Sequence, residues 1–163
     1  MRLFIAIPLD AAMRAAVKQV QGEFRRHGVN GNYTKPENLH LTLAFIGEYP
    51  DAGPVLDALE AVPFRPFELR LRGVGAFGDL WWLGLEPCEA LASYVRALRH
   101  ALAESGIPFD RKRFSPHITL VRRAIYGRGM PGVAVPEARM TVERVALMRS
   151  DRGKDGMIYT ELN

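Results

Sequence analysis

The sequence predicts an α+β fold of two similar lobes, related by pseudo-twofold symmetry, whose sheets face one cleft. Three observations lead to this prediction. Strand and helix patterns follow one another across residues 1–163 without a linker or a shift in composition, which indicates a single domain. The order strand, helix, strand occurs in both halves of the chain. The strand after each long helix also carries one repeated pattern, His40-Leu41-Thr42-Leu43 and then His117-Ile118-Thr119-Leu120.

In the first half, residues 3–7 form an apolar run that ends before Pro8 and predicts a buried strand. Asp10 can cap the helix that follows, whose apolar residues recur at helical spacing as far as Phe24. Glycine and asparagine at 28–31 end this helix. Residues 39–46 alternate and predict a strand, and residues 55–62 predict a second, shorter helix.

In the second half, residues 67–71 alternate and residues 80–85 form an apolar run, so both predict strands. Pro87 opens a helix of about 18 residues with an apolar stripe, which ends at Gly106 and Pro108. The next strand begins at His117 and runs to about Val121. After a loop rich in glycine and proline, residues 141–148 and 157–162 predict two late strands.

Composition excludes several classes of protein. Apolar residues make up 48% and charged residues 25%, which is typical of a globular chain and not of disorder. The apolar run at 3–9 is too short to span a bilayer and lacks the features of a signal peptide. Cys88 is the single cysteine, so no internal disulfide can form. We therefore expect a cytoplasmic protein without a membrane partner, and a monomer, because no coiled-coil pattern is sustained.

The chemistry of the repeated pattern follows from strand geometry. Successive side chains of a strand point to opposite faces, so His40 and Thr42 share the face opposite the two leucines, and His117 and Thr119 do likewise. Opening a phosphodiester needs one group to take a proton from water and another to give one to the leaving oxygen, and histidine can do either. Threonine hydroxyls can donate to the phosphate oxygens. The alternative interpretation is that both pairs lie on solvated strand faces.

The remaining polar features favour structural interpretations. His27 and His100 fall among arginines in predicted helices, and the four histidines and one cysteine show no metal-ligand spacing. The glycines at 73, 75 and 78 superficially fit a dinucleotide fingerprint but lie between two predicted strands, so they indicate a connection rich in turns. A net charge of +4 suits a polyanionic partner as well as an ordinary basic surface. The residues that could contact an RNA backbone are Arg111, Lys112, Arg113, Arg123, Arg149, Arg152 and Lys154.

Residues 35–43, with Phe45 and Gly47, resemble the first motif of the 2H phosphoesterase superfamily, and in particular of the RNA 2′,3′-cyclic phosphodiesterases, also called 2′-5′ RNA ligases. Residues 114–122 are similar to their second motif, and residues 2–7 and 150–159 also match, so the resemblance covers nearly the whole chain. It implies two lobes of antiparallel sheet with outer helices, and no metal or cofactor. It also implies hydrolysis of 2′,3′-cyclic phosphate RNA ends to a 2′-phosphate, with a weak reverse reaction that joins RNA ends through a 2′-5′ bond.

The resemblance also implies roles for individual residues. His40 would protonate the departing 3′ oxygen and His117 would activate water, although the residues themselves leave open which histidine does which. Thr42 and Thr119 would hold the phosphate. The histidine roles rest on the family alone, since both groups can serve as acid or base.

Each histidine is followed, five residues later, by one further position that matches the family. Arg122 would bind phosphate, and Phe45 would pack against a base. Strand parity puts both on the far face, so each needs a bend or a strand end to reach the site. The alternatives are a surface arginine and a core phenylalanine. Tyr33 stands where the family often has tryptophan, and it would contact the substrate by stacking or packing.

The expected partners are RNA ends that carry a 2′,3′-cyclic phosphate, with tRNA fragments as one candidate. Two alternatives remain open at the level of sequence. One is an RNA-binding or phosphate-sensing module without turnover, and the other is a phosphodiesterase of a small cyclic nucleotide or of an ADP-ribose cyclic phosphate. The presence of both histidines and both threonines favours an enzyme, because binding alone needs no acid–base pair.

Overall fold

The computed structural model describes all residues, 1–163, and has two antiparallel sheets with three α-helices. The strands of one sheet follow the order β3-β1-β8-β9, and those of the other follow β2-β6-β5-β4-β7. The elements are β1 (Arg2–Pro8), α1 (Ala11–Arg26), β2 (Asn30–Tyr33), a 3₁₀ turn (Pro36–Asn38), β3 (His40–Glu48), α2 (Ala52–Glu60), β4 (Phe67–Phe77), β5 (Leu80–Leu85), α3 (Glu89–Glu104), β6 (His117–Ile125), β7 (Arg139–Val142), β8 (Ala146–Gly153) and β9 (Gly156–Glu161).

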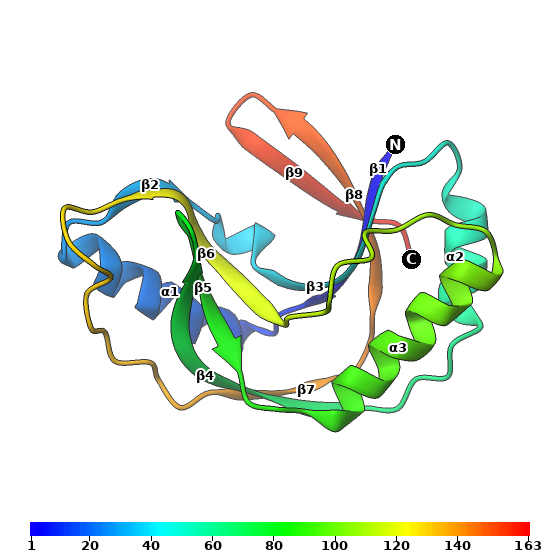
Figure 1. The fold of residues 1–163 in the computed structure, drawn as a ribbon, viewed down its shortest axis with the longest axis horizontal. Helices are drawn as coiled ribbons and strands as arrows, with labels where there is room; N and C mark the ends of the chain where they lie inside the picture. Colours follow the sequence, from blue (N-terminus) through cyan, green and yellow to red (C-terminus); the bar gives the residue numbers. More distant parts are fainter.

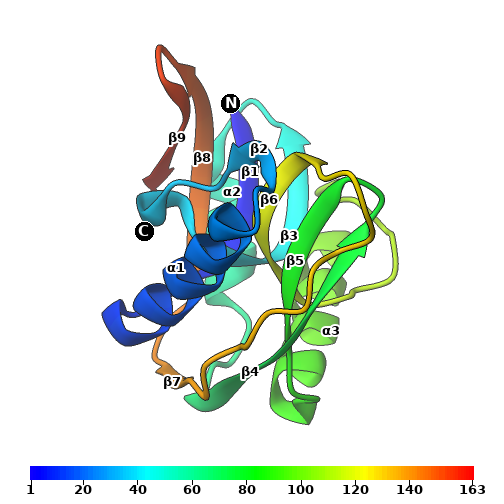
Figure 2. The ribbon, with the colours of Figure 1, turned by 90° about the vertical axis from the view of Figure 1, so that its left-hand side faces the viewer.

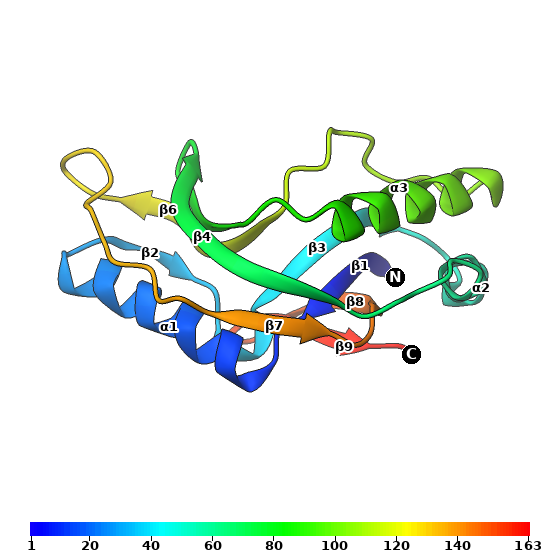
Figure 3. The same ribbon diagram turned by 90° about the horizontal axis from the view of Figure 1, so that it is seen from below.

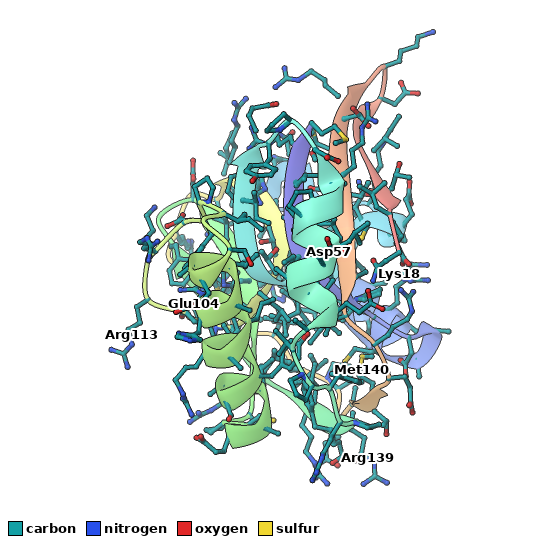
Figure 4. All side chains as sticks on the ribbon, turned by 90° about the vertical axis from the view of Figure 1, so that its right-hand side faces the viewer. Lys18, Asp57, Glu104, Arg113, Arg139 and Met140 are labelled. Atoms are coloured by element: carbon teal, nitrogen blue, oxygen red, sulfur yellow. The ribbon has the colours of Figure 1, made fainter.

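The helices cover the sheets crosswise (Figure 1). Helix α1 follows β1 of the four-stranded sheet but packs on the five-stranded one, where Phe24 meets the Trp81 ring with centroids 5.1 Å apart. Helix α3 follows β5 of the five-stranded sheet but lies with α2 over β3 and β8. Figures 3 and 4 show α2 and α3 together at one end, with Asp57 and Glu104 on their outer faces. Because each lobe is covered by a helix that leaves the other sheet, the two lobes share one core cluster of 37 buried residues.

The predicted fold class is confirmed, and so are most of the predicted elements. Asp10 caps α1, since the Met13 backbone N–H donates to its Oδ1 at 2.7 Å. The glycines of the apparent dinucleotide fingerprint lie in β4 and in the turn to β5, where Gly78 has φ +58°. None of the helices is long and apolar enough to cross a membrane.

Two parts of the secondary structure differ from the prediction. The single strand predicted over 141–148 is wrong, because β7 ends at Val142 and β8 begins at Ala146, and the two belong to different sheets. The exposed pair Glu143 and Arg144 interrupts the alternation where the chain crosses between sheets. Strand β2 begins within residues 28–31, where the sequence predicts only the end of the first helix, since the polar and mostly exposed residues of β2 give no apolar pattern.

The hairpin of β8 and β9 projects beyond the body of the molecule (Figures 1 and 2). Its turn end is held to the rest of the molecule, because the buried Asn38 side chain donates to the carbonyl of Met157, next to the hairpin turn, at 2.9 Å. The hairpin therefore adds a wall beside the first residues of β3.

Candidate active site

The two histidine strands contain the same irregularity at the same place. In β3, Ile5 pairs with Ala44 but Ala6 pairs with Thr42, so one extra residue bulges from the strand. In β6, Trp81 pairs with Val121 but Trp82 pairs with Thr119. A β-bulge of this kind shifts the alternation of side chains by one.

This bulge explains how Phe45 and Arg122, five positions after each histidine, reach the cleft. Leu43 and Ala44 are both buried, as are Leu120 and Val121, so the strict alternation ends there. The next residue in each strand, Phe45 or Arg122, then returns to the face of the histidine and the threonine. The backbone thus supplies the bend that strand parity required.

Both imidazoles are held by the same backbone contact. Nδ1 of His40 lies 2.6 Å from the Asn38 carbonyl, and Nδ1 of His117 lies 2.7 Å from the Ser115 carbonyl. Since a carbonyl can only accept, each Nδ1 carries the proton and donates it, and Nε2 is left as the reactive nitrogen. The Thr42 hydroxyl donates to Nε2 of His40 at 2.8 Å.

Aromatic rings fix the plane of each imidazole. His40 lies between Phe4 and Tyr159, with ring centroids 5.0 and 5.4 Å away. His117 meets Phe77 edge-on at 5.1 Å and Trp82 at 6.3 Å. Both histidines are therefore oriented by packing as well as by hydrogen bonds.

Glycine makes room for one of these rings. The indole of Trp82 lies over Gly75, where an added Cβ would come within 2.2 Å of it. Gly73, two residues earlier in β4, has open space at the same position. Gly75 is thus required by its tryptophan neighbour and not by a bound dinucleotide.

Two adjoining hollows open beside the histidines and share Thr42 and Phe45. The first, here the His40 hollow, has a volume of about 290 Å³, and the second, the His117 hollow, about 380 Å³. The His40 hollow is also lined by Arg2, Phe4, His40, Arg122, Ser150, Arg152, Met157 and Tyr159. The His117 hollow is also lined by Leu43, Ala44, Phe77, Arg99, Asp110, Lys112, Arg113, Phe114, Ser115 and His117.

The electrostatic surroundings favour a neutral His40 in the free protein. Burial lowers its pKa below 6.5, and the positive charges of Arg122 and His117 lower it further, while the bond to the Asn38 carbonyl acts in the opposite direction. Arg122 is on β6 and His40 is on β3, and both line the His40 hollow. The two strands therefore bring functional groups from both lobes to the same hollow.

The structure brings together most, but not all, of the predicted site residues. His40, Thr42, Phe45, His117 and Arg122 line the two hollows. The half-buried Thr119 follows His117 on the same strand face but lines neither hollow.

Tyr33 lies farther out, in a neighbouring hollow of about 650 Å³ that shares Arg122, Met157 and Tyr159 with the His40 hollow. Its hydroxyl donates to the Val29 carbonyl at 2.7 Å, and the Arg25 guanidinium lies 4.1 Å above its ring. Burial raises its pKa. Tyr33 is therefore placed beside the path out of the site rather than next to the histidines.

Most of the other candidates lie on the outer surface, but among the predicted basic residues Lys112 lines the His117 hollow and Arg152 the His40 hollow. His27 ends α1 and is exposed, and the exposed His100 lies 3.6 Å from Glu104 on α3. Arg113 lies at the rim of the His117 hollow with its side chain directed outward (Figure 4). No group of three or more histidine, cysteine or acidic side chains is arranged to hold a metal ion.

Sequence reasoning missed several residues of the site, namely Arg2, Phe4, Phe77, Trp82, Ser150 and Tyr159. Arg2 and Phe4 are two apart on β1, so the alternation of that strand put them on one face, but nothing told which face met the cleft. The pairing of β1 between β3 and β8 supplies that information.

A larger hollow, of about 700 Å³, lies elsewhere, between α2 and the last residues of the chain. Arg144 lines it, but its guanidinium is held by Glu161 of β9 through two hydrogen bonds of 2.6 and 2.8 Å. No histidine lines it. The two histidines of the repeated pattern both lie at the two smaller hollows.

The geometry agrees with the comparison to protein families. The model of the 2′-5′ RNA ligase superfamily matches residues 8–154 of this chain. The chain belongs to this superfamily. Both histidine motifs fall within the matched residues.

Relatives and solved structures extend the likeness over the whole chain. The RNA 2′,3′-cyclic phosphodiesterase of Thermus thermophilus is 34% identical and is aligned over 99% of this chain and 88% of its own length. That of Geobacillus stearothermophilus is 33% identical over 74% of this chain but only 41% of its own length. The structure of Escherichia coli LigT with 3′-AMP is 28% identical with a TM-score of 0.81, covering 99% of this chain and 95% of LigT.

Proposed function

We propose that this phosphodiesterase opens 2′,3′-cyclic phosphates at RNA ends, with His40 as the acid and His117 as the base. The observation that carries the proposal is that both imidazoles hold their Nδ1 proton on a backbone carbonyl, which leaves Nε2 free to react, and that they line two adjoining hollows. Curated relatives that align over nearly the whole chain are RNA 2′,3′-cyclic phosphodiesterases. Two fixed imidazoles beside one phosphate are what acid–base opening of the ring requires.

In the proposed reaction, Nε2 of His117 takes a proton from a water molecule as the water oxygen bonds to phosphorus. The bond from phosphorus to the 3′ oxygen breaks, and His40 gives that oxygen the proton of its own Nε2. The products are a 2′-phosphate and a 3′ hydroxyl. A proton then passes from His117 to solvent, so that His117 is again neutral, and His40 takes up a proton again when the next substrate binds.

The low pKa of His40 fits this role once the substrate is bound. In the free protein Arg122 and His117 lower the pKa of His40, in addition to burial. A bound phosphate brings a negative charge that offsets the positive charge of Arg122 and raises the pKa of His40 in the complex. His40 then carries its proton only when a substrate is present.

We assign the phosphate oxygens to Thr42, Thr119 and Arg122. The hydroxyl of Thr42 is next to Nε2 of His40, and Arg122 lines the same hollow. Hydrogen bonds to a charged group contribute roughly 1.5–3 kcal/mol each. The nucleoside meets Phe45, and the exposed Phe77 offers a second aromatic face, while Tyr33 contacts more distant parts of the RNA.

With a 5′ hydroxyl in place of water, the same site would weakly join a 2′,3′-cyclic end to that hydroxyl through a 2′-5′ bond. His117 would take the proton of the 5′ hydroxyl, and His40 would again protonate the departing 3′ oxygen; the two roles are exchanged only when the 2′-5′ bond is cleaved again. The chain would work as one domain and as a monomer, with tRNA fragments among its substrates. A phosphodiesterase of small cyclic nucleotides uses the same chemistry. A binding module without turnover is less favoured, because it has no use for two oriented imidazoles.

The test is incubation of the purified protein, in EDTA, with a short RNA ending in a 2′,3′-cyclic phosphate, resolving 2′- from 3′-phosphate products. We expect the 2′-phosphate from the wild type, and a rate about 10²–10⁴-fold lower in His40→Ala and in His117→Ala. His100→Ala, an exposed histidine on α3, is the matched control and keeps the wild-type rate. Absence of turnover on this RNA and on cyclic mononucleotides would contradict the proposal.

A further inference from the structure

The His40 hollow carries positive charge that no carboxylate of its lining offsets. Three arginines line it, Arg2, Arg122 and Arg152, and no carboxylate does. None of the three takes part in an ion pair of the structure. Elsewhere arginines are neutralised by neighbours, in the pairs Arg70–Glu68, Arg96–Glu89, Arg144–Glu161 and Arg149–Asp151.

The three arginines occupy two zones. Arg122 is close enough to His40 to lower its pKa, whereas Arg2 and Arg152 are not among the groups that do so. Arg2 pairs with Ser150 across β1 and β8, and Arg152 follows Ser150 by two positions on the same face. Arg2 and Arg152 thus lie one step beyond the reacting phosphate, at the outer end of the hollow.

Two contacts prepare this outer zone for an anion. The Arg2 guanidinium lies over the Phe45 ring, 5.0 Å from its centroid, which limits the orientations of the side chain. Ser150 is 8% exposed and lines the hollow between the two arginines. Unpaired guanidinium groups around a hydroxyl are suited to bind a phosphate.

The direction of the reaction says which phosphate this is. In an in-line displacement, the entering water and the leaving oxygen lie on opposite sides of phosphorus. If His40 protonates the 3′ oxygen, the ribose lies on the side of His40. The chain of the nucleotide then continues from the ribose into the His40 hollow.

We propose that Arg2 and Arg152 bind a second phosphate, the one on the 5′ side of the nucleotide that carries the cyclic phosphate. This inference rests on the proposed function and extends it to the substrate class. The preferred substrates carry a second phosphate one nucleoside away from the reacting one, either the diester of an RNA chain or a free 5′-phosphate.

Three substrates test the proposal. They are cytidine 2′,3′-cyclic phosphate, the same compound with a 5′-phosphate, and a dinucleotide ending in cytidine 2′,3′-cyclic phosphate. We expect kcat/KM to be about tenfold or more higher for the second and third. A larger gain for the dinucleotide than for the 5′-phosphate would identify the RNA diester as the source, and equal gains a phosphate of either kind.

Arg2→Gln and Arg152→Gln should each lower this preference several-fold, and the double variant should abolish it. Arg149→Gln is the matched control, because it removes one charge from the same strand at an arginine that pairs with Asp151. It should keep the wild-type preference. A double variant that keeps the preference would overturn the proposal.

The outcomes separate this proposal from the proposed function. Equal kcat/KM on all three substrates would overturn the second-phosphate site and leave the phosphodiesterase standing. If no substrate turns over, the proposed function fails, and titration of cytidine 2′-phosphate against cytidine 2′,5′-bisphosphate still tests the site. Tighter binding of the bisphosphate, lost in the double variant, would support it, and equal binding would overturn it.

Discussion

The two lobes share one frame and differ in what surrounds each histidine. Both have a strand, a helix and a second strand that starts with histidine, and both second strands bulge at the same position. Yet Phe45 and Arg122, the residues that the bulges turn to the cleft, are an aromatic ring in one lobe and a cation in the other. The partner of the threonine also differs, Ala6 facing Thr42 and Trp82 facing Thr119.

The difference teaches how a symmetric fold can assign unequal roles. The repeated strand and bulge bring one imidazole from each lobe to adjoining hollows, which is the symmetric part. The unequal neighbours then set the charge around each ring. Three arginines and no carboxylate line the His40 hollow, whereas the carboxylate of Asp110 accompanies the cations that line the His117 hollow.

The largest expected effect comes from a substrate with a changed leaving group, which shows which of the two histidines is the acid and which is the base. A cyclic substrate with sulfur in place of the 3′ oxygen needs no protonation to leave, because a thiolate is a far weaker base than an alkoxide. We expect His40→Ala to lose roughly 10²–10⁴-fold on the oxygen substrate and to recover most of that on the sulfur one. His117→Ala should lose a similar factor on both. Recovery of His117→Ala instead would exchange the two roles.

The second prediction concerns Arg122, the cation of the His117 lobe that lines the His40 hollow. Arg122→Gln should lower kcat/KM about tenfold, by loss of a charged hydrogen bond to phosphate. It also removes one cause of the low pKa of His40. The limb of the pH–kcat/KM profile that belongs to His40 should therefore move to higher pH, because that profile reports the free enzyme.

Which limb moves identifies the role of His40. If His40 is the acid, activity is lost as pH rises through its pKa, so the alkaline limb moves up; if it is the base, the acidic limb moves up. Arg123→Gln is the control, since it removes the neighbouring exposed charge on the same strand. Profiles that coincide for the two variants would remove Arg122 from the surroundings of His40.

The paired motifs could be predicted from the sequence because strand alternation acts within a few residues. The same reasoning put Phe45 and Arg122 on the wrong face, since a bulge depends on how β3 and β6 pair with neighbouring strands. Arg2 and Phe77 could not be predicted as site residues for a related reason. Their strands lie far along the chain from the histidines that they approach.

The fold likewise has local features that the sequence predicts and long-range features that it does not. Helices α1 and α3 follow from apolar spacing, and Asp10 marks the start of α1. That each helix covers the sheet of the other lobe is a long-range property, carried by contacts such as Phe24 with Trp81. Strand β2 escaped prediction because its mostly exposed residues carry no pattern, and its pairing with β6 alone makes it a strand.

The third prediction concerns the ring that only the His117 lobe has. Gly75→Ala puts a methyl group where the Trp82 indole lies, and such overpacking costs about 1–3 kcal/mol in the free energy of unfolding. The displaced indole would also release His117, so kcat should fall. Gly73→Ala meets nothing within 4 Å in the same strand and serves as the control. Urea unfolding of both variants measures the difference, and equal stabilities would show that Trp82 can move without cost.

The smallest effect is on stability against pH and is specific to the His40 lobe. The pKa of His40 is lowered below 6.5 by folding, so the unfolded chain binds this proton more readily than the folded one. The contribution to stability is therefore present above pH 6.5 and lost as pH falls through the pKa of the folded state. His40→Asn should flatten the fall of Tm between pH 7 and about 5, whereas His100→Asn, at an exposed position, should not.

The pair Arg144–Glu161 also loses stability in acid, but only below the ordinary glutamate pKa of 4.5, because its carboxylate pKa is lowered. Curves of Tm against pH that superimpose for the wild type and His40→Asn would mean that His40 meets the same surroundings folded and unfolded, and the electrostatic difference between the two lobes would disappear with it.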